Sequence, residues 1–434
     1  MEKLFKLKER GTNVRTEIIA GITTFMTMAY ILAVNPYFLS QTGMDFSRVF
    51  AATAIASAIA TLIMGLLANL PFGLSAGMGL NAFFAYTVCL GMGYSWQWAL
   101  SAILVEGLIF LLLTFCNIRE AIVNSIPLTL KRAIGGGIGL FIAYIGLKNA
   151  GIIVSDANSV STLSAAWFKG TPGLALLGTL IIAMLTIHRV RGALLIGIIV
   201  TTLIGIPFGI TTYAGGSFTP SAPYFCPFAF GEIFSSGRSL FDFMVVVFTF
   251  LFLDMFDTVG TLIGCAEKSG IVREDGTIPN CKEALLADAV GTTAGAMLGT
   301  STITTFVESA SGVSEGGRTG LTAVTVAVLF LLSLFLEPLF GSIPSAATAP
   351  ALIIVGVMMI TPLTEIDFLE YTEGIPAFLT VLMMVCASSI SDGIMFGVIS
   401  YVALNAMSGK AKKLSPTTWI IAALFVFKII VSQL

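Results

Sequence analysis

Two short polar segments that interrupt apolar stretches of this 434-residue chain carry carboxylates. The segment FLDMFDTVGTL, residues 252–262, places four polar side chains at steps of three and four, so that they share one face of a predicted helix. They are Asp254, Asp257, Thr258 and Thr261. In TTFVESASG, residues 304–312, Glu308 stands where a strand-like Thr/Ile run gives way to small residues typical of a helix start. A carboxylate and free backbone N–H groups at such a junction suit a polar ligand.

The composition of the chain indicates whether these acids lie in water or in a membrane. Hydrophobic residues make up 56% of the chain and charged residues only 11%, whereas a soluble domain carries roughly 25% charged residues. This excludes soluble globular, disordered and nucleic-acid-binding proteins. Long apolar runs and 44 glycines favour packed transmembrane helices over an outer-membrane barrel. The sequence therefore predicts an all-α polytopic membrane protein, embedded in a lipid bilayer and with no nucleic-acid partner.

Inserting a carboxylate at membrane depth costs a free energy of at least about 2.5–3.5 kcal/mol. Each of these acids should therefore have a functional or a structural role. The structural alternative for Asp254 and Asp257 is a hydrogen-bond network between helices, and it is stronger for Asp254. The structural alternative for Glu308 is a cap on its own helix. Glu106 and Asp288 lack a comparable context, and we expect them to have structural roles.

Apolar runs between residues 16 and 408 fit fourteen membrane spans of about 20 residues or less. Segments predicted on the same side as the N-terminus hold 17 Lys and Arg residues, and segments on the opposite side hold 4. This asymmetry places both termini in the cytoplasm by the positive-inside rule. A last apolar stretch, residues 417–432, is short, and the sequence leaves open whether it crosses the membrane or lies in the interface.

Two of the predicted spans are short and interrupted, and they occupy third place in each set of seven. They are GLSAGMGLNAFFAY, residues 73–86, and GTSTITTFVESASG, residues 299–312. Residues 65–79 align loosely with residues 295–309, and because seven is odd the second set would be inverted relative to the first. Paired broken spans are the best sequence indication of a transporter's central binding site. We therefore expect two inverted seven-span repeats, with short strands in broken spans 3 and 10.

Other chemistry is poorly supported by the sequence. The single histidine, His188, adjoins two arginines at a predicted span end, and there is no HExxH or Walker A motif. The six cysteines form no C-x-x-C pair. We expect no metal and no cofactor. Gly291, Gly295 and Gly299 recur at every fourth residue, which is typical of a helix-packing face rather than a ligand loop.

Four motifs in order identify a resemblance that covers essentially the whole chain. They are GITTFMTMAYILAVNP (residues 21–36), GLSAGMGLNAFFAY, FLDMFDTVGTL and TTFVESASG. The chain resembles the nucleobase–cation symporters of the xanthine/uracil permease superfamily, and specifically their AzgA-like branch of adenine, guanine and hypoxanthine permeases.

The resemblance implies a division into two kinds of domain. Spans 1–4 (residues 16–115) and 8–11 (residues 240–338) would form a core domain. Spans 5–7 (residues 116–211) and 12–14 (residues 346–408) would form a gate domain, commonly at a dimer interface, so a homodimer is expected through it. A cytoplasmic segment, residues 1–15, would precede them. A basic segment with a short apolar helix, residues 409–434, would follow.

The resemblance also implies a binding site at the crossing of the broken spans. The two family acids fall on Asp257 and Glu308. The uracil carriers have histidine where this chain has Thr261, a departure that fits a larger purine and removes histidine from proton coupling. Backbone around the broken spans would meet the base edge, and the Phe306 ring could stack on the base. The residues assigned to this edge are Ala76, Gly77, Met78, Phe306 and Val307.

The function implied is import of guanine, hypoxanthine or adenine across the cell membrane by proton symport, with alternating access between core and gate. Asp257 is the expected principal proton carrier, with Asp254 and Glu308 as the next candidates, and the residues alone do not exclude Na⁺. Two alternatives remain from the residues. One is an anion or sulfate carrier of the same architecture, and the weaker one is an intramembrane enzyme.

Overall fold

In the computed structural model, the described residues are 2–115, 127–154, 161–213, 215, 218–269, 271 and 278–433. The chain forms two compact units. Unit 1 comprises Met1–Phe115 and Lys148–Ala351, and unit 2 comprises Cys116–Leu147 and Leu352–Leu434. Residues 116–126, which begin the predicted gate segment 116–211, lie outside the described residues. The predicted core and gate boundaries stay predictions.

Unit 1 contains most of the helices and the two-stranded sheet formed by β1 and β4. Its N-terminal elements are α1 (Glu2–Phe5), α2 (Val14–Met28), α3 (Ile31–Ser40), α4 (Phe46–Ile63), the π-helix η1 (Met64–Ala68), β1 (Leu74–Ala76), α5 (Met78–Ala82), the π-helix η2 (Phe83–Gly91) and α6 (Trp96–Phe115). Its later elements are β2 (Ile153–Val154), β3 (Thr162–Leu163), α9 (Gly170–Ile187), α10 (Ala193–Gly205), α11 (Phe230–Ile233), α12 (Gly237–Ser269), α13 (Cys281–Leu298), β4 (Ile303–Thr305), α14 (Ser309–Ser314), α15 (Gly320–Ser333), the 3-10 turn η3 (Leu334–Leu336) and α16 (Glu337–Gly341).

Within the described residues, eight helical segments are long and apolar enough to cross a membrane. They are Val14–Ser40, Phe46–Ala68, Trp96–Phe115, Leu128–Asn149, Gly170–Ile187, Gly320–Gly341, Ser345–Glu365 and Ile390–Met407. The chain is thus a helical polytopic membrane protein, as its composition predicts. The arrangement of fourteen spans in two inverted repeats stays a prediction.

The two broken spans meet as a short antiparallel sheet, as the sequence predicts for their strands. β1 and β4 pair in the register Leu74 to Thr305, Ser75 to Thr304 and Ala76 to Ile303. The Gly77 N–H donates to the Thr302 carbonyl over 3.1 Å, and the Phe306 N–H donates to the Gly73 carbonyl over 3.0 Å. Phe306 extends the sheet, and the chain then enters the short helix α14, Ser309–Ser314.

The outer edges of this sheet need partners, because an unpaired backbone group in a membrane interior costs several kcal/mol. On the β1 edge, the hydroxyl of Thr61 on α4 accepts from the Leu74 N–H over 2.9 Å and donates to the Leu74 carbonyl over 3.1 Å. On the β4 edge, Thr292 of α13 accepts from the Ile303 N–H over 3.3 Å and donates to its carbonyl over 3.0 Å. The two strands are therefore closed in the same way by one threonine each.

Gly291 and Gly295 of α13 lie against its neighbours, which confirms the predicted packing face for these two residues, whereas Gly299 is the C-cap of the helix with a φ of +89°. A Cβ on Gly291 would lie 2.6 Å from the Cβ of Ala60 on α4, and one on Gly295 would lie 3.1 Å from the Ser301 carbonyl oxygen. Only glycine lets α13 approach α4 and β4 this closely.

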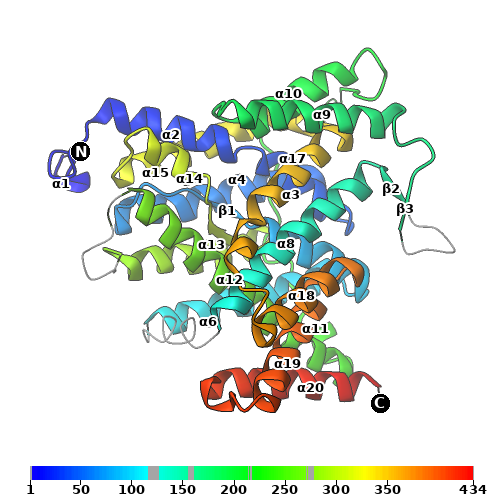
Figure 1. Ribbon diagram of the computed structural model, residues 1–434. Coiled ribbons are helices and arrows are strands. Elements are labelled where there is room, and N and C mark those ends of the chain that lie inside the picture. The colour runs from blue at the N-terminus through cyan, green and yellow to red at the C-terminus, as the bar shows by residue number, and fades with distance from the viewer. Residues whose placement is uncertain are drawn as a thin grey trace. The chain divides into compact units, whose positions relative to one another are not determined.

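A buried acid near the chain start joins α2 to α15, which lie side by side (Figure 1). Glu17 of α2 is fully buried. Its carboxylate accepts from the Arg318 N–H over 2.9 Å and from the Thr322 hydroxyl over 2.6 Å. It also accepts from the N–H groups of Thr319 and Thr322 over 3.2 and 3.3 Å. Glu17 of α2 thus accepts from two N–H groups just before α15 and from the Thr322 N–H in its first turn, which helps to cap α15 from another helix.

We expect Glu17→Gln to destabilise the fold, because the amide replaces an acceptor oxygen with a donor that faces N–H groups. Loss of hydrogen bonds to a buried charged group should lower the free energy of unfolding by about 1.5–3 kcal/mol. Thermal unfolding of the purified protein measures this. Glu9→Gln is the matched control, because Glu9 forms only an exposed pair with Lys6 over 3.4 Å. Equal unfolding temperatures for the two variants would contradict the capping role of Glu17.

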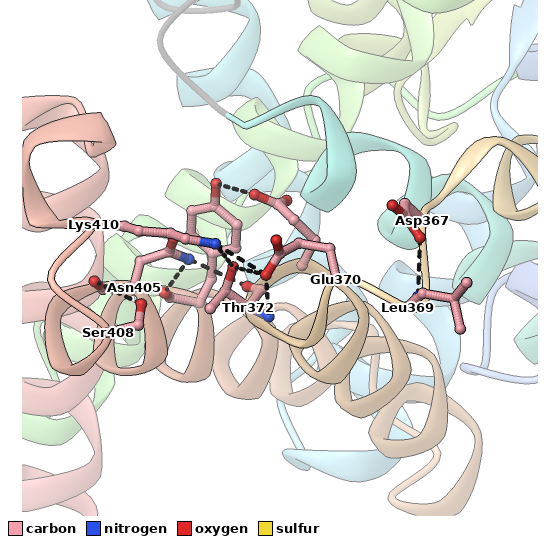
Figure 2. A network of polar contacts seen from close by, with 9 residues as sticks. Asp367, Leu369, Glu370, Thr372, Asn405, Ser408 and Lys410 are labelled. Carbon is pink, nitrogen blue, oxygen red and sulfur yellow. Dashed lines mark hydrogen bonds and ion pairs between the residues drawn. The ribbon is translucent and has the colours of Figure 1, made fainter.

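Unit 2 is built on the helical hairpin of α18 (Tyr371–Cys386) and α19 (Ile390–Met407). The other helical elements in this part of the chain are α8 (Leu128–Asn149), α17 (Ser345–Met359), η4 (Thr361–Glu365), η5 (Ala411–Lys413) and α20 (Pro416–Gln433). Lys410 joins the open end of the hairpin by donating to Glu370 over 3.0 Å and to the Thr372 hydroxyl over 3.2 Å (Figure 2). The hydrogen bonds from Lys410 and then Thr372 lower the pKa of Glu370 to about 2, so this carboxyl group stays ionised at neutral pH.

Candidate functional site

The predicted site residues come together in unit 1, around the point where β1 and β4 end. Ala76 pairs with Ile303 in the sheet, and Gly77 and Met78 follow it into α5. Phe306, Val307 and Glu308 follow β4 into α14. Asp257 and Thr261 come from the middle of α12. Residues some 230 positions apart in the chain therefore meet because the two broken spans pair.

Glu308 presents its carboxyl group to α2 and α3 rather than to its own helix. It occupies the N-cap position of α14 with helical backbone angles, and its side chain makes no capping hydrogen bond. Instead, the Tyr30 hydroxyl donates to Oε1 of Glu308 over 2.8 Å. The Thr27 hydroxyl also lies 3.4 Å from the Glu308 carbonyl oxygen. The alternative in which Glu308 caps its own helix is therefore wrong.

Asp257 lies beside the end of β1 and remains partly exposed. A Cβ built on Gly77 would lie 3.5 Å from Oδ2 of Asp257, and 2.7 Å from the Thr304 methyl carbon. Asp257 is also close enough to Asp288 and Glu308 for their charges to act on it. Asp257 and Glu308 thus lie in one polar region, at the ends of strands β1 and β4.

Thr261 keeps its hydroxyl on its own helix. Its Oγ1 donates to the carbonyl of Asp257 over 2.7 Å, with the Thr258 carbonyl at 3.1 Å. The Thr261 hydroxyl proton is therefore already engaged, and toward a ligand this side chain offers an acceptor oxygen and a methyl group.

The predicted polar face of α12 divides into two parts. Asp254 and Thr258 are buried, whereas Asp257 and Thr261 are partly exposed. The Thr258 hydroxyl lies 3.1 Å from Oδ1 of Asp254, 2.7 Å from Oδ1 of Asp288 and 2.7 Å from the Thr304 hydroxyl. Because Thr258 has one hydroxyl proton, it donates to one of these groups at a time. This geometry fits the structural network that the sequence offered as the alternative for Asp254.

The backbone positions assigned to the base edge differ in what they can offer. The N–H groups of Gly77 and Phe306 are both used in extending the sheet. The Cys265 thiol lies 3.8 Å from the carbonyl oxygens of Phe306 and Val307. The Phe306 side chain is 5% exposed, whereas Val307 is 48% exposed. Of these two side chains, Val307 is the one that is accessible to a ligand.

Sequence reasoning missed several polar partners of this region. Tyr30 lies within the motif GITTFMTMAYILAVNP, residues 21–36, but the sequence alone did not indicate a role for it. Asn81 is buried and accepts from the Ser301 hydroxyl through Oδ1, while its Nδ2 has no hydrogen-bond partner among the described residues. Glu106 accepts from the Thr302 hydroxyl over 2.9 Å, which fits its expected structural role. A polar side chain inside an apolar motif was the available signal for Tyr30 and Asn81.

In the described part of this region, the acidic side chains are not arranged as the ligands of a metal ion. Within the ranges that the structure describes, no group of three or more His, Cys, Asp or Glu side chains is placed to hold a metal ion. The chemistry that the residues offer is hydrogen-bond acceptance by Glu308 and Asp257, together with exchange of a proton at a carboxyl group.

The fold is similar to that of solved transporters. The transmembrane domain of a cyanobacterial bicarbonate transporter matches with a TM-score of 0.66 at 17% identity, covering 89% of this chain and 97% of that chain. SLC26A9 matches with a TM-score of 0.65 at 11% identity, covering 91% of this chain and 66% of that one. At such identities the likeness shows a shared fold.

Sequence comparisons are more specific. A putative permease of Methanocaldococcus jannaschii is 48% identical over 99% of this chain and 98% of its own length. An adenine permease of Escherichia coli is 44% identical over 99% and 96%. A guanine/hypoxanthine permease of Bacillus subtilis is 43% identical over 99% and 100%. The xanthine/uracil family model, described as a permease family, matches residues 15–396. This chain therefore belongs to the xanthine/uracil permease family of membrane transporters.

Proposed function

We propose that the protein transports purine nucleobases, namely adenine, guanine or hypoxanthine, into the cell by proton symport. Full-length relatives named as adenine and guanine/hypoxanthine permeases support the substrate class. The observation that carries the proposal is the Glu308 carboxyl group, tethered by Tyr30 at the sheet end and close to Asp257. Purines present N–H donors, and a held carboxylate accepts them in strong charge-assisted bonds.

The transport cycle that we propose is alternating access, with two inverted seven-span repeats forming core and gate domains. The similar threonine closures of β1 and β4 support equivalent positions for the two broken spans in such repeats. We further propose insertion in the cell membrane with both termini in the cytoplasm, and a homodimer through the gate domain.

The first test is uptake of labelled hypoxanthine into cells deficient in purine uptake. Cells that produce this protein should accumulate the label, and excess adenine or guanine should reduce it. If uptake does not exceed that of cells with an empty vector, the proposed substrate class is wrong.

An anion carrier is the second candidate, because the similar folds include a bicarbonate transporter. Two carboxylates at the site disfavour it, since an anion would be repelled by Glu308 and Asp257. Adding bicarbonate or sulfate to the uptake assay decides between the two candidates. A purine carrier should keep its rate, whereas competition by either anion would favour the anion carrier.

Gly77 offers a steric test of where the substrate lies. In Gly77→Ala, the new methyl group would meet Thr304 at 2.7 Å and narrow the space beside Asp257. Crowding of this kind costs about 1–3 kcal/mol, so we expect purine affinity to fall about tenfold. Gly135→Ala is the control, because a Cβ there has open space within 4 Å. Unchanged affinity in Gly77→Ala would place the base elsewhere.

A further inference from the structure

Resting on the proposed function, we infer that Tyr30 is a positioning residue for substrate recognition. Its phenolic hydroxyl fixes the orientation of the Glu308 carboxyl group. The fixed carboxyl group keeps Oε2 as the acceptor for a purine N–H.

The first support is the place of Tyr30 in the chain. α2 ends at Met28 and α3 begins at Ile31, so Tyr30 lies in the break between them. The Leu32 N–H bonds to the Ala29 carbonyl over 3.1 Å, and the Ala33 N–H bonds to the Tyr30 carbonyl over 3.0 Å. The first predicted span thus passes through a tighter turn at the residue that reaches Glu308, while Ala29 and Tyr30 keep helical backbone angles.

The second support is the burial and pairing of the side chain. Tyr30 is 1% exposed, and a buried tyrosine hydroxyl needs a hydrogen-bond partner. The hydroxyl donates to Oε1 of Glu308 over 2.8 Å. A glutamate side chain has three rotatable bonds, so a tether on one oxygen removes most of its alternative orientations.

The third support is that the same helix end also reaches the Glu308 main chain. The Thr27 hydroxyl, which bonds to the Thr24 carbonyl over 2.8 Å, lies 3.4 Å from the Glu308 carbonyl oxygen. The one hydroxyl proton of Thr27 is used in the bond to Thr24, so Thr27 contacts the Glu308 main chain while Tyr30 holds its side chain. The Tyr30 bond makes the two carboxyl oxygens of Glu308 inequivalent, because Oε1 accepts the hydroxyl proton, and Oε2 is the oxygen assigned to the substrate.

The test is a double-mutant cycle on purine binding to the purified full-length protein. Tyr30→Phe removes the hydroxyl and keeps the ring, and it should weaken hypoxanthine binding about tenfold, at the scale of one hydrogen bond to a charged group. In a Glu308→Gln background, the same change should alter the remaining affinity less than about twofold. Tyr86→Phe is the matched control, because its hydroxyl bonds to Gln41 over 3.1 Å in the same unit. Wild-type affinity in Tyr30→Phe, or a full additive loss in the double variant, would overturn the inference.

A second measurement separates this inference from the proposed function. If the wild-type protein binds no purine, the proposed function fails, while the contact itself is still tested by thermal unfolding without ligand. Tyr30→Phe should lower the unfolding temperature in the wild-type background and lower it less in the Glu308→Gln background, where a neutral amide oxygen replaces the charged acceptor. Equal shifts in both backgrounds would show that Tyr30 does not act through Glu308.

Discussion

Glu308→Gln is expected to weaken purine binding by about ten- to a hundredfold, because charged hydrogen bonds are worth roughly 1.5–3 kcal/mol. Glutamine keeps the size of the side chain, but its amide nitrogen can only donate. One of two acceptors is then lost: either the Tyr30 hydroxyl or the substrate N–H faces a donor. Direct binding of labelled hypoxanthine to the purified variant measures the effect.

The control for this prediction is Glu315→Gln. Glu315 follows the same short helix, α14, and forms an ion pair with Arg191. That variant should bind purine like the wild type. Wild-type affinity in Glu308→Gln would show that Glu308 does not contact the base.

Asp257→Asn is expected to abolish accumulation driven by a pH gradient while leaving binding and exchange intact. Asparagine mimics the protonated carboxyl group, so the site can no longer gain and lose a proton. Asp257 is partly exposed at the sheet end, whereas Asp254 is buried in the Thr258 network. The measurements are uptake into proteoliposomes with and without an imposed pH gradient, and counterflow of labelled hypoxanthine.

Asp242→Asn is the matched control for Asp257→Asn. Asp242 lies on the same helix, α12, and accepts from the Tyr94 hydroxyl over 2.8 Å. We expect it to respond to the gradient normally. If Asp257→Asn still concentrates purine under a pH gradient, the proton is carried elsewhere. If wild-type accumulation follows a Na⁺ gradient instead, proton symport itself is wrong.

Local features of the site could be predicted from the sequence because they depend on neighbouring residues. The Thr/Ile run before Glu308 and the small residues after it gave the end of β4 and the start of α14. The steps of three and four from Asp254 to Thr261 placed the polar face of α12. The sequence favoured a structural role for Asp254 over Asp257, but it could not predict the partners of that network, because Thr258 reaches Asp288 of α13 and Thr304 of β4 only once the helices pack.

Contacts between distant segments were beyond sequence reasoning. Tyr30 lies 278 positions from Glu308, and Glu17 lies 305 positions from Thr322. Neither contact follows from periodicity, since each depends on how whole helices pack. The turn between α2 and α3 does not follow from the sequence either, because neither of the residues there, Ala29 and Tyr30, is a glycine or a proline.

Counterflow of labelled hypoxanthine in proteoliposomes tests the central claim most directly, because it needs only the purified protein and no imposed ion gradient. Vesicles preloaded with unlabelled hypoxanthine should take up the label transiently. Adenine or guanine outside should suppress this uptake, whereas uracil and bicarbonate should not. Label that enters no faster than into protein-free vesicles, or uptake suppressed equally by bicarbonate, would contradict a purine carrier built on Glu308 and Asp257.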